Sequence, residues 1–166
     1  MKRSVSYNIL LAATFVWCAA LFVPPLLASL SSLSSAQAFY DLFSRICHQF
    51  DSRSIHIFGY KLAVCARCFG IYLGFFAGVL CSRVWAAGRS INAIKRWTFA
   101  LLPMLLDVAL DSLGVHSSGM FTRLSTGVFF GVNAALILAP IIVQELEKLK
   151  TTPHHVRESS YATQTR

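Results

Sequence analysis

Four long apolar runs constrain this 166-residue chain more than any other feature. They cover residues 7–30, 62–84, 97–113 and 124–143. A helix needs about 20 residues to cross the hydrocarbon core of a bilayer, which is close to the length of each run. The pattern predicts an all-α, polytopic membrane protein, in which residues 1–150 form a bundle of four transmembrane helices. Pro24 and Pro25 predict a kink or an early end in the first helix.

The composition supports a membrane protein and disfavours several other classes. Apolar residues make up 55% of the chain and charged residues only 13%, whereas soluble domains carry roughly a quarter charged residues. A disordered or coiled-coil protein is excluded, and a soluble enzyme is disfavoured. The net charge of +8 is explained by basic loops facing anionic lipid. No basic helix face or basic–aromatic module is present, so we expect the lipid bilayer, and not nucleic acid, as partner.

The distribution of Lys and Arg predicts the orientation of the chain. With the N-terminus in the cytoplasm, ten basic residues lie inside: Lys2, Arg3, Arg83, Arg89, Lys95, Arg96, Lys148, Lys150, Arg157 and Arg166. The outer side holds five: Arg45, Arg53, Lys61, Arg67 and Arg123. We therefore expect both termini inside, in a bacterial cytoplasmic (inner) membrane, with the long connection 31–60 outside. The short connection 85–96 is basic, and the polar tail 151–166 is predicted to be a disordered cytoplasmic segment.

One alternative concerns the N-terminal segment. Its basic start, its apolar run and the later Ala36-Gln37-Ala38 could form a signal peptide with its cleavage site. Cleavage would leave three spans and the same outward-facing connection.

Three of the five cysteines form a candidate metal site. Cys47 and His48 lie in the long connection, and Cys65 and Cys68 form a C-x-x-C pair at the start of the second apolar run. A C-x-x-C pair can present two sulfurs to one metal ion, and the four side chains together supply the N/S ligand set of tetrahedral zinc. The sequence thus predicts a zinc site at the outer membrane boundary.

Two other interpretations of these thiols stay open. An outward-facing compartment is oxidising, so Cys65 and Cys68 could instead form a redox-active or structural disulfide, with the third thiol as exchange partner. All three could also be merely packed thiols. Cys18 and Cys81 lie inside apolar runs, where we expect them to pack as small apolar side chains.

Four charged residues lie where lipid is expected. Arg67 is in the second span, Asp107 and Asp111 are four residues apart in the third, and Arg123 precedes the fourth. An ionised group deep in the membrane costs roughly 2.5–3.5 kcal/mol on insertion scales, so such groups are paired, hydrated or functional. The sequence predicts a polar network of these two arginines and two aspartates. A structural ion-pair role, a catalytic or proton-relay role for Asp107, and a shared metal are the alternatives.

Small residues recur every four positions in the second and fourth spans. The two stripes are Gly70, Gly74 and Gly78, and Gly127, Gly131 and Ala135. Such stripes let transmembrane helices approach closely. We expect tight helix packing there.

Several motifs together resemble a family of bacterial membrane proteins that is known as a domain of unknown function. The matching segments are Cys47-His48-Gln49, Arg53-Ser54, Cys65 to Gly74, Pro103 with Asp107, Arg123, Thr126-Gly127 and Gly131. The similarity covers about residues 40–135. It implies a fold-sized unit and a set of residues but no reaction, because the family is described only as predicted membrane proteins.

These observations lead to one hypothesis with two alternatives. The leading one is an integral membrane protein of unknown reaction with a zinc site formed by Cys47, His48, Cys65 and Cys68. If the site is catalytic, metal-assisted hydrolysis or transfer with Asp107 as base is the expected chemistry, whereas four protein ligands would indicate a structural metal. The alternatives are a membrane thiol-disulfide oxidoreductase and a non-enzymatic assembly or transport factor. The sequence does not identify a substrate, a protein partner or an oligomeric state.

Overall fold

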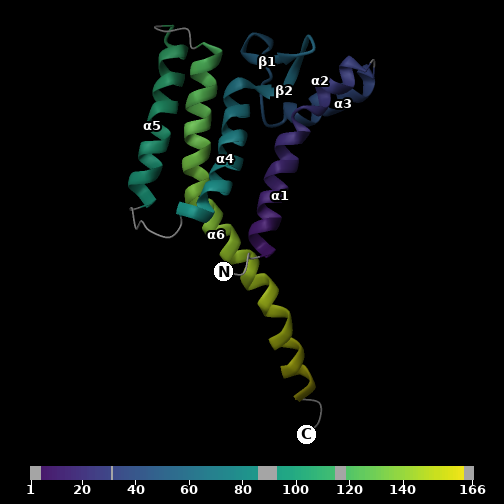
Figure 1. Ribbon diagram of the computed structural model, residues 1–166, viewed down its shortest axis with the longest axis vertical. Coiled ribbons are helices and arrows are strands. Elements are labelled where there is room, and N and C mark those ends of the chain that lie inside the picture. The colour runs from purple at the N-terminus through teal and green to yellow at the C-terminus, as the bar shows by residue number, and fades with distance from the viewer. Residues whose placement is uncertain (1–4, 31, 86–92, 115–118, 163–166) are drawn as a thin grey trace.

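The computed structural model describes residues 5–30, 32–85, 93–114 and 119–162. In chain order the elements are α1 (Val5–Ala20), α2 (Val23–Ser29), α3 (Leu33–Ser44), the short 3-10 helix η1 (Asp51–Arg53), β1 (Ser54–Ile57), β2 (Tyr60–Cys65), α4 (Ala66–Trp85), α5 (Ala93–Ser112) and α6 (Met120–Ala162). Helices α1, α4, α5 and α6 form an elongated bundle, and the strands, α2 and α3 gather at one end of it (Figure 1). We call this the hairpin end.

The first apolar run is broken, as the two prolines led us to expect, but the break comes earlier than predicted. Helix α1 ends at Ala20 and α2 begins at Val23. Pro24 and Pro25 lie in the first turn of α2, where a missing backbone N–H leaves no hydrogen bond unmade. Both prolines are fully buried. The break turns α2 away from the axis of α1 (Figure 1).

The purely helical prediction is wrong for residues 54–65, which form a β-hairpin. Strands β1 and β2 pair antiparallel, with His56 opposite Lys61 and Ile57 opposite Tyr60. The two-residue turn has φ values of 55° at Phe58 and 81° at Gly59, which is typical of tight hairpin turns. The predicted start of the second span at residue 62 is therefore a strand, and the helix begins at Ala66.

Helices α4 and α6 pack on each other through the two small-residue stripes. A Cβ added to Gly70 would lie 2.5 Å from the Leu124 carbonyl oxygen, and one added to Gly78 would lie 2.6 Å from the Ala135 Cβ. Gly127 and Gly131 approach the backbone of α4 in the same way, at Arg67 and Ile71. The backbones of the two helices thus touch without intervening side chains, which is the close approach that the stripes predicted.

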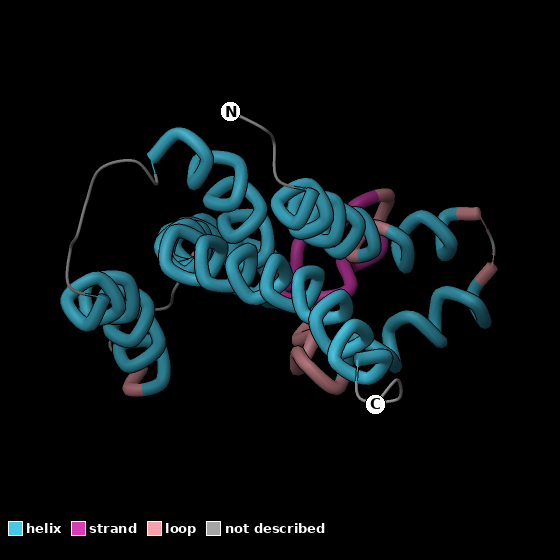
Figure 2. The backbone as a smooth tube through the Cα atoms, turned by 90° about the horizontal axis from the view of Figure 1, so that it is seen from below, coloured by secondary structure: helices cyan, strands magenta, loops and turns pink. Residues whose placement is uncertain are grey.

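Helices α1 and α5 lie at the edges of this pair. The Tyr7 hydroxyl of α1 donates to the Val79 carbonyl of α4 at 2.7 Å. Helix α5 packs aromatic side chains against α6, with Phe99 and Phe129 edge to face and 5.3 Å between their ring centres. Figure 2, which looks along the bundle, shows α5 at one edge and α1 towards the other side of the α4–α6 pair.

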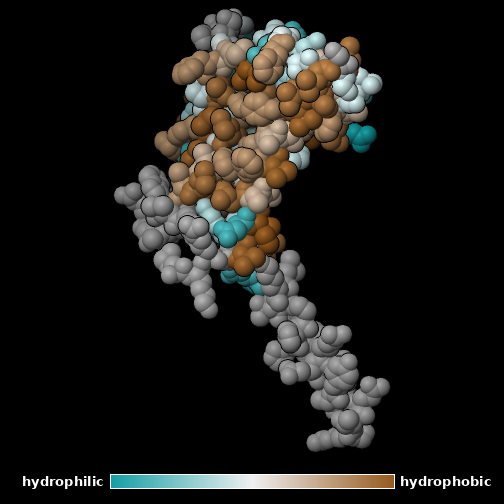
Figure 3. Space-filling model, turned by 45° about the vertical axis from the view of Figure 1, so that its right-hand side comes forward, coloured by the Kyte–Doolittle hydropathy of each residue, from teal (hydrophilic) through white to brown (hydrophobic). Residues whose placement is uncertain are grey.

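The surface of the bundle is strongly apolar (Figure 3). Phe15, Leu105 and Ile141 are among many large apolar side chains that are exposed. Within the described residues, two helical segments are long and apolar enough to cross a membrane, Val5–Ser29 and Met120–Lys148, and Ala66–Ser82 is a shorter apolar helix. These findings support a mostly helical protein with two candidate membrane spans, and they do not support the predicted number of four.

The structure describes most of one predicted cytoplasmic segment, the tail 151–166, and less than half of the other, the connection 85–96. Helix α6 continues to Ala162, through most of the tail that the sequence predicted to be disordered. Good helix formers between Gln144 and Lys150 carry the helix past the apolar run. Most of the predicted basic connection 85–96, at residues 86–92, lies outside the described residues.

Candidate metal centre

Three thiols from separate segments meet at the hairpin end of the bundle. Cys47 follows α3, Cys65 is the last residue of β2, and Cys68 lies in the first turn of α4. Their three Sγ atoms all lie within 4.8 Å of one another. Cys47 is buried, and Cys65 and Cys68 are partly buried.

Backbone hydrogen bonds and an apolar cluster bring these segments together. The Cys47 N–H donates to the Phe43 carbonyl at the end of α3 (3.1 Å), and the Cys65 N–H donates to the Cys47 Sγ (3.3 Å). The N–H of Ala63 donates to the Leu21 carbonyl (3.3 Å), which ties β2 to the break after α1. Leu21, Phe43, Ala63 and Val64 form a buried apolar cluster with Cys47, and Cys65 and Cys68 pack against it.

The environment of Cys65 favours a thiolate. Hydrogen bonds from the side chains of Cys47 and Cys68 hold the pKa of Cys65 well below its ordinary value, against the opposing effect of burial. The backbone N–H groups of Cys68 and Arg67, at the start of α4, also hydrogen-bond to this sulfur and lower its pKa. A helix N-terminus favours a negative charge. The thiolate is the form that binds metals and attacks disulfides. Of the three thiols, Cys65 is therefore the one whose surroundings favour these reactions.

The structure does not bring His48 into this group. Its side chain is exposed, and its ring stacks on Phe50 with an interplanar angle of 3° and 5.8 Å between ring centres. The buried Cys47 points into the apolar cluster, and the next side chain along this non-helical segment faces outward. Three candidate ligands therefore lie together, where the sequence predicted four.

Three thiols would leave a bound tetrahedral metal ion with one coordination position that they do not fill. Zinc in structural sites takes four protein ligands, whereas a site with three leaves one position for water or a substrate atom. Thiolates suit zinc and other thiophilic ions. In chemical terms the group could hold such an ion with one open position.

The remaining cysteines lie apart from this group. Cys18 is buried in α1 and its thiol donates to the Tyr72 carbonyl at 3.5 Å. Cys81 is exposed on α4. All five cysteines are free thiols.

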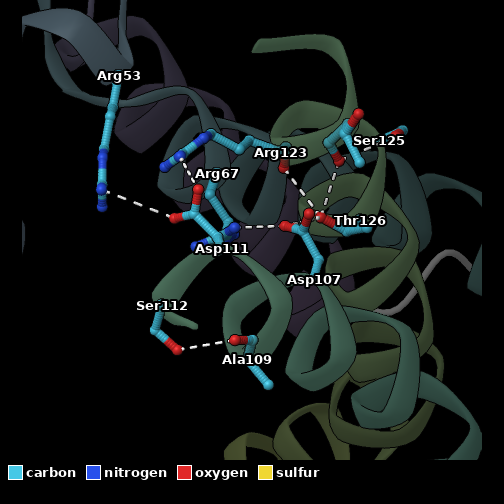
Figure 4. A network of polar contacts seen from close by, with 10 residues as sticks. Arg53, Arg67, Asp107, Ala109, Asp111, Ser112, Arg123, Ser125 and Thr126 are labelled. Atoms are coloured by element: carbon cyan, nitrogen blue, oxygen red, sulfur yellow. Dashed lines mark hydrogen bonds and ion pairs between the residues drawn. The ribbon is translucent and has the colours of Figure 1, made fainter. Parts of the chain in front are cut away.

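The four predicted network residues also meet at the hairpin end (Figure 4). The Arg67 guanidinium, from the first turn of α4, binds the Asp107 carboxylate of α5. Arg123, from the first turn of α6, binds Asp111 at 2.8 Å. Asp107 and Arg123 are buried. The repulsion between two carboxylates one helical turn apart is thus offset by one arginine for each.

Two further residues, which the charge pattern did not identify, belong to this network. Arg53 of η1 reaches Asp111 at 3.7 Å and stacks over the Phe50 ring, 5.4 Å from its centre. The Thr126 hydroxyl of α6 lies 3.5 Å from the Asp107 carboxylate. The resemblance motif that contains Arg53 was the one sequence signal for it. Through these contacts α5 is attached to α4, to α6 and to η1.

Comparison with known proteins identifies related sequences. Residues 47–137 match the family described as "Predicted membrane protein (DUF2085)", a segment that includes all three thiols and both ion pairs. An uncharacterised protein of Methanocaldococcus jannaschii, MJ1492, is 32% identical over 152 residues, which cover 86% of this chain and 96% of that protein. An uncharacterised protein of Methanothermobacter thermautotrophicus is 28% identical over 95 residues, or 57% of this chain and 86% of the relative. Both relatives are archaeal, so the expected restriction to bacteria is not confirmed. No solved structure matches the chain.

Proposed function

We propose, because the chain belongs to the DUF2085 family of predicted membrane proteins, that it is an integral membrane protein which holds a zinc ion at Cys47, Cys65 and Cys68. The observation that supports this most is the mutual approach of the three Sγ atoms within 4.8 Å. With Zn–S bonds of about 2.3 Å, tetrahedral ligands would lie roughly 3.8 Å apart. A small contraction of the group would therefore accommodate the ion.

The fourth coordination position of the metal distinguishes a structural role from a catalytic one. A structural site would need a fourth protein ligand, and His48, the candidate that the sequence suggested, is stacked on Phe50. Three thiolates with one free position favour a metal that binds an external donor atom. The reaction class consistent with this is metal-assisted hydrolysis or transfer on a substrate at the membrane boundary.

Asp107 has more support as a structural residue than as the base of such a reaction. Its carboxylate binds Arg67 and lies near the Thr126 hydroxyl, and its side chain is only 6% exposed. Hydrogen bonds and an opposite charge stabilise the ionised form and so weaken a carboxylate as a base. We therefore assign Asp107 to the polar network.

A four-span arrangement in the cytoplasmic membrane accounts for the remaining features. Helices α1, α4, α5 and α6 run along one another (Figure 1), and pairing of Arg67, Asp107, Asp111 and Arg123 lowers the cost of placing their charges near lipid. The excess of Lys and Arg on the segments opposite the hairpin end favours that side as cytoplasmic. On this proposal both termini are cytoplasmic and the thiol group faces outward.

A second function, thiol-disulfide exchange, is favoured by one specific observation. Cys65 and Cys68 form a C-x-x-C pair whose Sγ atoms lie within 4.8 Å of each other, and hydrogen bonding lowers the pKa of Cys65, as in an exchanging thiol pair. Metal binding and disulfide formation differ in what releases the thiols, because a chelator frees metal-bound thiols and a reductant frees disulfide-bonded ones.

Labelling of intact cells with a membrane-impermeant maleimide tests orientation and chemistry together. We expect Cys65 and Cys68 to be protected until a chelator is added, and then to react from outside. A Lys148→Cys variant, whose residue is exposed at the other end of the candidate span, should react only after the cells are permeabilised. Release by reductant alone would support the disulfide, and reaction of Cys65 and Cys68 only after permeabilisation would reverse the orientation. The labelled sites are read by peptide mass spectrometry.

A further inference from the structure

We propose that Asp107 positions the thiol group, acting through Arg67. This inference rests on the proposed function, because it concerns the geometry of the same metal site. On this proposal, the ion pair between Asp107 of α5 and Arg67 of α4 holds Cys65 and Cys68 in place.

Arg67 is the residue that joins the two clusters. It stands between Cys65 and Cys68 in the chain, so its backbone runs directly between two of the thiol residues. Its carbonyl lies against the backbone of α6 at Gly127. Its guanidinium binds Asp107. The same residue therefore joins two thiol residues in the chain and contacts both the adjacent helix and the buried carboxylate.

The guanidinium of Arg67 depends on Asp107 for its position. In the described part of the chain, Asp107 is the one carboxylate that Arg67 binds, and the buried Arg67 Nε has no hydrogen-bond partner. The Arg67 side chain is only 15% exposed, so water cannot readily replace the carboxylate. Removal of the Asp107 charge would leave this partly buried cation free to move, together with the first turn of α4 that carries it.

Asp111 provides a matched comparison on the same helix. It lies one turn from Asp107, is similarly enclosed at 13% exposure, and is also paired with arginine. It pairs, however, with Arg123 at 2.8 Å and with Arg53 at 3.7 Å, and neither of these two arginines lies between two thiol ligands. Loss of Asp111 should weaken the attachment of α5 and leave the thiol group unchanged.

The expected loss of zinc affinity follows from how little displacement of its ligands a metal site tolerates. Ligands must be held within about 0.5 Å of their working geometry, and loss of a residue that orients a ligand typically weakens metal binding about 10–100-fold. Asp107→Asn keeps the size of the side chain and removes the charge that holds Arg67. We expect it to weaken zinc binding by that factor.

Competition with a chromophoric chelator measures the zinc affinity of the full chain in detergent. The proteins compared are the wild type, Asp107→Asn, Asp111→Asn and Asp107→Glu, each checked for helix content by circular dichroism. Both Asn variants should unfold at lower temperature, but only Asp107→Asn should lose about 10–100-fold in affinity, and Asp107→Glu should restore much of it. Substitution with Co²⁺ gives a second readout, because its thiolate charge-transfer band reports ligand geometry.

Three outcomes decide between the hypotheses. A wild-type protein that binds no zinc refutes the proposed function. A wild type that binds zinc, together with equal affinities in the two Asn variants, refutes the positioning role of Asp107 alone. If Asp107→Asn does not fold, Thr126→Val, which removes the hydroxyl 3.5 Å from Asp107, should weaken binding several-fold, and an unchanged affinity would overturn the proposal.

Discussion

Replacing Cys68 by serine is expected to reduce the zinc content of the purified protein from about one ion per chain to nearly none. A serine hydroxyl is not ionised at neutral pH and is a far weaker ligand than a thiolate. The two thiols that remain, Cys47 and Cys65, would leave the ion with too few protein ligands for tight binding. Elemental analysis of the detergent-purified protein by mass spectrometry gives the metal-to-protein ratio.

A matched control separates this effect from the general cost of losing a thiol. Cys81 is on the same helix, is exposed and lies outside the thiol group, so Cys81→Ser should retain its zinc. Full zinc content in Cys68→Ser would contradict the metal site. A mixed disulfide trapped on Cys65 in Cys68→Ser, with no zinc in the wild type, would instead identify thiol-disulfide exchange.

Replacing Gly74 by leucine is expected to abolish packing of α4 on α6. Even one added carbon at Gly74 would lie 2.8 Å from the Val128 Cα and 2.9 Å from its carbonyl carbon, and these backbone atoms cannot move without shifting the helix. Overpacking of this kind costs about 1–3 kcal/mol or more, which outweighs the helix-propensity gain of roughly 1 kcal/mol from removing a glycine. Thermal unfolding in detergent, followed by circular dichroism, measures the loss.

The control for this prediction is Gly119→Ala. An added Cβ at Gly119 meets no atom within 4 Å, so its unfolding temperature should stay near that of the wild type. Alanine at Gly74 should lie between leucine and the wild type, because it introduces the contact with Val128 without the rest of the side chain. A Gly74→Leu protein as stable as the wild type would show that α4 and α6 do not pack as described.

Features that depend on local spacing could be predicted from the sequence. The glycines of α4 and α6 recur every four residues, which places them on one face of each helix whatever the rest of the fold does. Arg67, Asp107, Asp111 and Arg123 were identified because charges in apolar helices must find partners. The three thiols were grouped because C-x-x-C and Cys-His spacings are typical of metal sites.

Features that depend on tertiary context could not be predicted in the same way. Residues 62–65 are apolar and continue into α4, so hydropathy alone does not distinguish the end of a strand from the start of a span. The direction of His48 follows from the burial of Cys47 in the apolar cluster with Leu21, Ala63 and Val64, residues that are distant from it in the chain. Arg53 of η1 reaches Asp111 of α5 at 3.7 Å, although the two residues lie far apart in the chain, so local spacing does not indicate this contact.

Zinc K-edge X-ray absorption of the purified, zinc-loaded protein tests the central claim most directly, because it counts the atoms bound to the metal. The three-thiol site predicts a first shell of three sulfur atoms at about 2.3 Å and one oxygen or nitrogen at roughly 2.0–2.1 Å. Loss of one sulfur in the shell of a residually loaded Cys65→Ser protein would agree with this assignment. A shell without sulfur, or one with four sulfur atoms, would contradict a metal centre built from Cys47, Cys65 and Cys68.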